Sequence, residues 1–167
     1  GAALSLEGGT GIGVAIAVNI VNGLDTNASI GYDVTVDATG SINVTADASL
    51  LPKSEELPII GTVGITSFAA GVAGSAGGTA VGGSSSVNVF LVDTHAFIDH
   101  DASITAGQNV KVEATDKLTL FSAAGGIGAS TGNAGVGIGL DVGVIVRDTT
   151  AWIGTGTDVT ATSGDIT

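Results

Sequence analysis

The stretch GVGIGLDVGVIVRD, residues 135–148, decides the fold class, because two kinds of residue alternate along it. From residue 136 to residue 146 the even positions carry Val, Ile or Leu, while the odd positions from 135 to 143 carry Gly, apart from Asp141. Successive side chains of an extended strand point to opposite faces. The alternation therefore predicts a β-strand with one aliphatic face and one face of almost bare backbone.

The same alternation occurs twice more, at residues 11–20 (GIGVAIAVNI) and 80–89 (AVGGSSSVNV), where Gly83 and Ser85 interrupt the aliphatic face. The small-residue face keeps its parity in all three copies. Its glycines are Gly11, Gly13, Gly82, Gly135, Gly137 and Gly139. Glycine in a strand lets another backbone approach closely. Two alternatives are open for what packs there: another part of the same coil, which we favour, or a neighbouring filament.

The composition narrows both the fold and the partners. The 167 residues include 28 Gly, 2 Pro and no Cys. Gly disfavours helices and β-branched residues favour strands, so we predict an all-β fold. Sixteen acidic residues against four basic ones give a net charge of −12. This balance argues against nucleic acid and anionic membrane surfaces as partners, and no apolar run reaches the length of about 18 residues that would favour membrane insertion.

Each copy continues in the same order after its Gly-rich strand. An Asp-Thr pair follows, beginning at Asp25, Asp93 and Asp148, and we expect it to turn the chain through side-chain hydrogen bonds. Short strands come next. We expect them near residues 28–30, 34–36 and 42–46, then 96–98, 102–104 and 110–114, then 151–153 and 158–160, with a last one starting at Ile166.

The Asp-Thr pairs are 68 and then 55 residues apart, which indicates repeats of unequal length. We divide the chain into copies at residues 1–67, 68–120 and 121–167, the last incomplete, so that Phe68 and Phe121 occupy matching positions. The chain reads as a segment of a longer protein.

The extra length of the first copy falls at residues 51–64, which hold both prolines and which we interpret as an exposed loop insertion. Stacked repeats bury a core that a single repeat cannot bury alone. We therefore predict one continuous β-solenoid, parallel β-helix-like, over residues 1–167. We expect each repeat to form two to three coils of about 20 residues.

Two stretches resemble a known class of repeat. They are AVNIVNGLDTNASIGYDVTVDATGSINVTADA (residues 17–48) and SVNVFLVDTHAFIDHDASITAGQNVKVEATD (residues 86–116). Their order of V-N-V, D-T-x-A-x-I, a variable turn and V-x-V-x-A is similar to the repeats of large bacterial filamentous adhesins, of the leukotoxin and filamentous-haemagglutinin types exported by type V secretion. The resemblance implies a right-handed β-solenoid stalk, secreted and held on the bacterial cell surface.

The weak candidates for a metal site are Asp93, His95, Asp99 and Asp101, which share one strand face. The alignment of the copies assigns Ala96 and Ile98, on the opposite face, to the core. Carboxylates and an imidazole can bind a divalent cation. The first copy has Asn27 where the second has His95, so the repeat does not require the imidazole, and we favour a solvated polar face. The recurring Asp of the Asp-Thr pair could bridge Ca²⁺, but we favour its turn-forming role and expect no cofactor.

Phe97 and Trp152 occupy matching outward positions and form a possible contact surface. Catalysis on a β-solenoid would need acidic residues clustered with Lys or Arg. The chain has one Arg and three scattered Lys, so we expect no enzyme.

We therefore predict a structural stalk or spacer of a giant extracellular adhesin or surface fibre. Its expected partners are neighbouring repeats of the same long chain or identical chains in a filament, with host-cell or surface glycans as possible further partners. The alternative is a carbohydrate- or surface-binding module that uses the outward aromatic and acidic residues.

Overall fold

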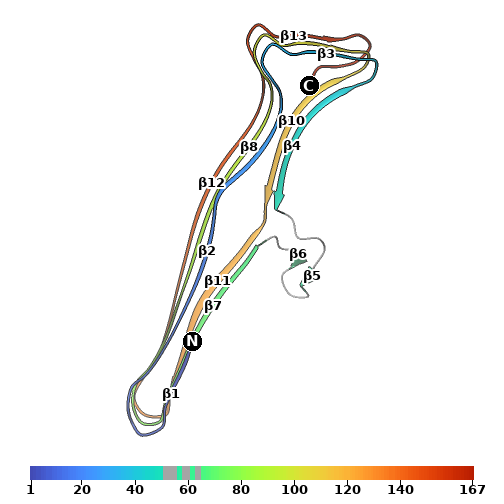
Figure 1. Ribbon diagram of the computed structural model, residues 1–167. Helices are drawn as coiled ribbons and strands as arrows, with labels where there is room; N and C mark the ends of the chain where they lie inside the picture. Colours follow the sequence, from blue (N-terminus) through green and yellow to red (C-terminus); the bar gives the residue numbers. More distant parts are fainter. Residues whose placement is uncertain (51–55, 58–60, 63–64) are drawn as a thin grey trace. The chain divides into compact units, whose positions relative to one another are not determined.

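The computed structural model describes residues 1–50, 56–57, 61–62 and 65–167 (Figure 1). These residues form strands and turns, and they include no helix with the length and apolar character needed to traverse a bilayer. The insertion predicted at residues 51–64 lies outside the described residues, except for β5 (Glu56–Leu57) and β6 (Gly61–Thr62). These two short strands pair antiparallel.

The fold is the predicted all-β, solenoid-like stack of parallel strands. One complete coil consists of β7 (Ile65–Ser75), β8 (Ala80–Ile98), β9 (Ser103–Ala106) and β10 (Val110–Leu118), and β11 (Leu120–Ser130) begins the next. In Figure 1, β11 runs alongside β7. Their parallel register pairs each residue of β11 with the residue 55 positions earlier.

Each repeat therefore makes one coil, and the prediction of two to three coils of about 20 residues was wrong. The physical reason is the length of the strands, because β8 alone takes 19 residues. The matching of Phe68 with Phe121 was also wrong: Phe68 pairs with Ala123, and Phe121 pairs with Thr66. The shift of two residues keeps the parity, so the outward face is the same.

The first coil contributes β1 (Ala2–Ser5), β2 (Gly11–Ile30), β3 (Thr35–Ala38) and β4 (Ile42–Leu50). The third contributes β12 (Gly135–Ile153) and β13 (Asp158–Ala161). The sheets have the strand orders β1-β7-β11, β12-β8-β2, β13-β9-β3 and β10-β4. Ile166 forms a single parallel bridge with Val110. The short strands expected near residues 34–36, 42–46, 102–104, 110–114 and 158–160 are thus confirmed in order. Those expected at 28–30, 96–98 and 151–153 are not separate strands, because these residues are the ends of β2, β8 and β12.

The Asp-Thr pairs do not turn the chain. Asp25, Asp93 and Asp148 lie inside the long strands β2, β8 and β12, which continue for several residues beyond them. Thr94 points inward and is buried. The chain turns only after Ile98, where β8 ends. Inward and outward side chains alternate without interruption up to that residue, as in a regular strand.

Gly23 explains why the first two Asp-Thr pairs are 68 residues apart while the glycine strands are 69 apart. Its φ of +74° is in the left-handed region that glycine adopts without penalty. One extra residue in β2 changes the parity of inward and outward side chains at this point. These are the features of a β-bulge.

The chain divides into two compact units, and each is described by itself. Unit 1 comprises Gly1–Val21, Leu51–Phe90 and Thr119–Ile145, and unit 2 comprises Asn22–Leu50, Leu91–Leu118 and Val146–Thr167. The long strands β2, β8 and β12 contribute their first halves to unit 1 and their second halves to unit 2.

Unit 2 has a conventional aliphatic core. Its buried residues are Val44, Ala46, Ala96, Ile98, Ala102, Ile104, Ala106 and Val110. The sequence alignment had assigned Ala96 and Ile98 to the interior, and both are completely buried. Burial of each large aliphatic side chain contributes about 1.5–3 kcal/mol, so this cluster stabilises the unit.

Unit 1 has the opposite arrangement. Up to Asn19 and Asn88 the inward positions of β2 and β8 are Gly, Ala, Ser and Asn, and most outward positions carry aliphatic side chains. Ile12 and Ile16 of β2 are 62% and 71% exposed. The aliphatic face of the sequence pattern is therefore the outer face of unit 1.

The small-residue face lies against the facing sheet of the same chain, on strands of the same coil or of the neighbouring coil. A Cβ atom on Gly137 of β12 would lie 2.1 Å from the carbonyl oxygen of Gly126 in β11. One on Gly82 would lie 2.3 Å from the carbonyl oxygen of Ile127. Gly11, Gly13, Gly135 and Gly139 meet backbone oxygens in the same way. Only residues without a side chain allow the two sheets to approach this closely.

Candidate functional site

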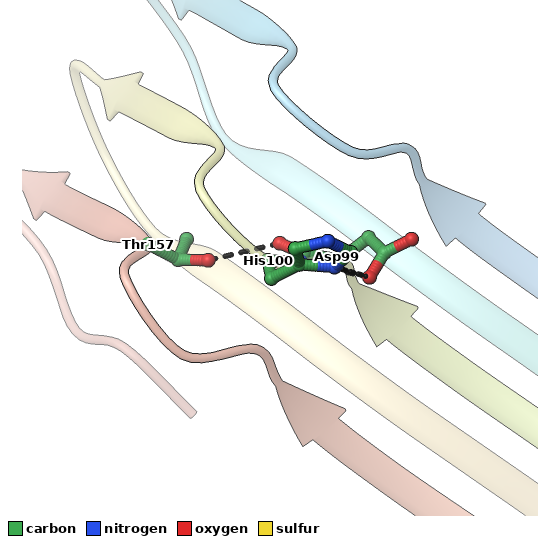
Figure 2. Close-up of polar contacts among 3 residues, drawn as sticks. All are labelled: Asp99, His100 and Thr157. Carbon is green, nitrogen blue, oxygen red and sulfur yellow. Dashed lines mark hydrogen bonds and ion pairs between the residues drawn. The ribbon is translucent and has the colours of Figure 1, made fainter.

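Asp99, one of the weak metal candidates, lies in the turn after β8, where its oxygen atoms contact His100 and Thr157 (Figure 2). Its Oδ1 accepts a hydrogen bond from the backbone N–H of His100 at 2.8 Å, and it lies 2.6 Å from His100 Nδ1. The hydroxyl of Thr157 donates to the Asp99 carbonyl oxygen at 2.9 Å. Hydrogen bonds from the His100 side chain and then its backbone hold the pKa of Asp99 below its usual value.

Asp101 has a backbone role in the same turn. Its φ is +57°, and Asp33 of the preceding coil has a φ of +53°. Gly156, at the equivalent place in the third coil, has a φ of +74°. Asp tolerates the left-handed region better than most residues, so this recurring conformation accounts for Asp at the position.

His95 and Asp93 lie on the outer face of β8 in unit 2. His95 Nδ1 is 2.6 Å from the hydroxyl oxygen of Thr150 on the adjacent strand β12. Within the described ranges no three His, Cys, Asp or Glu side chains gather closely enough to hold a metal ion. The sequence placed Asp93, His95, Asp99 and Asp101 on one strand face, but the strand ends at Ile98 and the last two turn away.

The two aromatic candidates meet each other. The rings of Phe97 and Trp152 stack with centroids 4.6 Å apart and planes 2° from parallel. Each ring thereby covers one face of the other and leaves that face unable to stack on a sugar ring. Such a pair stabilises adjacent strands by about 0.5–1.5 kcal/mol beyond its buried area. Tyr32 and His100 form a second, tilted contact at 4.4 Å.

Unit 1 contains a buried polar network that was not predicted from the sequence. Asn88 is fully buried; its side-chain nitrogen donates to Ser122 Oγ at 2.8 Å and its side-chain oxygen accepts from Asn19 at 2.9 Å. Ser122 donates to Asp141 at 2.8 Å. Ser86 joins the network through Ser122 at 3.0 Å. The recurring Asn of the V-N-V element, Asn19 and Asn88, was the signal for this network, although Asn alone does not indicate which way it points.

Unit 2 also contains an ion pair that the sequence did not indicate. The guanidinium Nε of Arg147 donates to Asp116 Oδ2, and Nη2 donates to the Asp116 carbonyl oxygen at 2.8 Å. The Asp116 side chain is only 1% exposed. The charge of this acid is therefore compensated by the one Arg of the chain.

No pocket opens among the residues that the structure describes. Comparison of the chain with protein-family models, curated proteins and solved structures found no match. Two surfaces distinguish the described part of the chain. One consists of side chains that contact each other on adjacent strands of unit 2, such as Phe97 with Trp152, and the other consists of the exposed aliphatic side chains of unit 1.

Proposed function

We propose that this chain is a structural segment of an extracellular filamentous adhesin or surface fibre, where it acts as a spacer and carries out no catalysis. The observation that supports this most directly is the register between coils. β11 lies on β7 without a slip from Leu120 on Ile65 to Ser130 on Ser75. Each coil covers the strand edges of the coil before it and presents equivalent edges to the next coil. Further coils can therefore be added by repetition.

The bacterial cell surface as the location is supported by the resemblance of residues 17–48 and 86–116 to filamentous adhesin repeats. The absence of Cys from the sequence is compatible with export, since no thiol can mispair outside the cell. Neighbouring repeats of the same chain, or identical chains, are the partners that this role requires.

The dimensions of a coil qualify the role. Stacked parallel strands lie about 4.8 Å apart, so one 55-residue coil adds only that rise to the stack. Each added coil therefore contributes a large lateral surface but little length. A fibre of this kind is suited to display or pack its sides as well as to span a distance.

The proposal is tested by lengthening the stack. Extra copies of residues 65–119 inserted after Thr119 should continue the register, because Leu120 pairs with Ile65. Electron microscopy of chains with increasing numbers of inserted coils should show one dimension growing by about 4.8 Å per coil. Particles that grow equally in all dimensions would contradict the spacer function.

The carbohydrate-binding alternative has weaker support, because Phe97 and Trp152 stack on each other. Trp152 remains 43% exposed, so one measurement separates the two functions. Saturable binding to a glycan array that is lost in Trp152→Ala, with the fold intact, would favour the alternative.

A further inference from the structure

The outer face of unit 1 on β2, β8 and β12 carries an aliphatic surface, which we call the ridge face. It consists of Ile12, Val14, Ile16, Val18 and Ile20 of β2, Val81, Val87 and Val89 of β8, and Val136, Ile138, Leu140, Val142 and Val144 of β12. The ten side chains on β2 and β12 are between 39% and 71% exposed. No member of the ridge face is charged, in a chain whose net charge is −12.

The ridge face has a raised row on each side and a middle that is lower at Gly83 and Ser85. β8 lies between β12 and β2 in the sheet, and its outward positions include Gly83 and Ser85. A Cβ atom on Gly83 would meet no other atom within 4 Å. The two rows are about 10 Å apart, which is twice the spacing of neighbouring strands.

We propose that two copies of this chain pair through their ridge faces. Face-to-face sheets cross at an angle of about 30° because of their twist, so the raised rows of one copy pass over the lower middle of the other. Two copies of one surface match in twist, in width and in lack of charge, as a two-fold interface requires.

The available area supports a second copy as the occupant. An exposed aliphatic side chain offers on the order of 100 Å², so the ten half-exposed side chains offer on the order of 500 Å² per copy. Two copies would bury on the order of 1,000 Å² together, which is the lower limit for a specific interface. We therefore expect a reversible dimer rather than a permanent one.

The interface that we propose is distinct from the glycine face, which lies inside the coil. The proposed pairing is also independent of the spacer function. Pairing depends on the outer face of unit 1, whereas elongation depends on the strand edges of the coils. A chain that stays monomeric would overturn the pairing and leave the growth of the stack per inserted coil unchanged.

The test is sedimentation equilibrium of the 167-residue chain over concentrations from about 1 to 500 µM. We expect a monomer–dimer equilibrium that strengthens with added salt, because salt screens the repulsion between two chains of charge −12. A monomer throughout this range, or open-ended association, would overturn the proposal.

A matched pair of variants locates the interface. Ile138→Glu lies on the ridge face and Ile127→Glu lies on the outer face of β11, and the two isoleucines are 58% and 64% exposed. Both variants add one negative charge at an exposed position of unit 1. We expect Ile138→Glu to weaken the dimer at least 30-fold and Ile127→Glu to weaken it less than 3-fold, estimates based on a charge buried without a partner. Equal effects would overturn the proposal.

Cross-linking keeps the test decisive if Ile138→Glu does not fold. The chain contains no Cys, so Leu140→Cys introduces a single thiol. With a bifunctional thiol reagent long enough to join two rows about 10 Å apart, we expect covalent dimers from Leu140→Cys and few from Ile127→Cys at the same concentration. Equal yields, or binding of the unmodified chain to phosphatidylcholine vesicles in place of dimer formation, would overturn the proposal.

Discussion

The two units of this chain use the same three long strands and distribute their side chains in opposite ways. In unit 1 the inward positions of β8 include Gly82, Ser84 and Ser86, and in unit 2 they include Val92 and Ile98. The outward positions change correspondingly, from aliphatic to charged and aromatic. A strand can thus reverse its amphipathic character midway while the alternation of its faces continues.

The comparison shows that each unit is stabilised internally by a different kind of packing. Unit 2 buries aliphatic side chains, and its sequence carries three basic against twelve acidic residues, a net charge of −9. Unit 1 packs backbone against backbone and carries one Lys against four acidic residues, a net charge of −3. Substitutions at matched positions should therefore have opposite consequences in the two units.

The largest effect is expected where a side chain enters the glycine contact of unit 1. A Cβ atom on Gly126 would lie 2.0 Å from the carbonyl oxygen of Gly82, whereas one on the adjacent Gly125 would meet nothing within 4 Å. Gly126→Val should lower the free energy of unfolding by about 4 kcal/mol or more, because backbone atoms cannot move aside. Gly125→Val is the control and should be near neutral. Urea denaturation measures both, and equal effects would contradict the close packing of the sheets.

Truncation of isoleucine should separate the units next. Ile98 in unit 2 is completely buried, while Ile16 in unit 1 is 71% exposed. Ile98→Ala should reduce the free energy of unfolding by about 3 kcal/mol through lost burial and a cavity. Ile16→Ala should change it by less than about 0.5 kcal/mol, measured at concentrations where the chain is monomeric. A large loss in the second variant would mean that the ridge face is covered within a single chain.

Buried polar groups provide a smaller contrast. Asn88 in unit 1 donates to Ser122 and accepts from Asn19, so Asn88→Ala should cost about 1–3 kcal/mol by leaving these groups unpaired. Thr94 in unit 2 is equally buried, and its hydroxyl has no partner in the described part of the chain. Thr94→Val should be neutral or stabilise by about 1 kcal/mol. Thermal unfolding of both variants checks this, and destabilisation by Thr94→Val would indicate a missing partner for the hydroxyl.

The smallest expected effect is the pH dependence of the turn that contains Asp99. Since its pKa is lowered in the folded protein, the Asp99 carboxylate stabilises the fold above the ordinary Asp pKa of about 3.9. This contribution is lost as the pH falls through the lowered pKa. Asp99→Ala should therefore slightly lower the Tm at neutral pH and have no such effect near pH 2. His100→Ala should show the same dependence, and a Tm difference that persists at low pH would contradict it.

The strands and their order could be predicted from the sequence because alternation and repetition are local properties. The short strands of unit 2, and the inward positions of Ala96 and Ile98, follow from matching the copies. The turn expected at Asp93 could not be rejected in this way. Asp and Thr are common in turns, and they also fit the outward and inward positions that they occupy in β8. The placement of Asp99 and Asp101 on the same strand face as Asp93 was wrong for a related reason: spacing along a strand does not indicate where the strand ends.

What the sequence by itself determined is that the chain is a repeated all-β structure in which each long strand has an aliphatic and a bare face. What only the tertiary structure decided is which face is inside. Hydrophobic burial would place Ile12 and Leu140 inward, yet they are 62% and 57% exposed. The close approach of two backbones at Gly82 and Gly126 requires the bare face there, so the aliphatic face is turned outward. Such a choice depends on the distance between sheets, which a linear pattern does not contain.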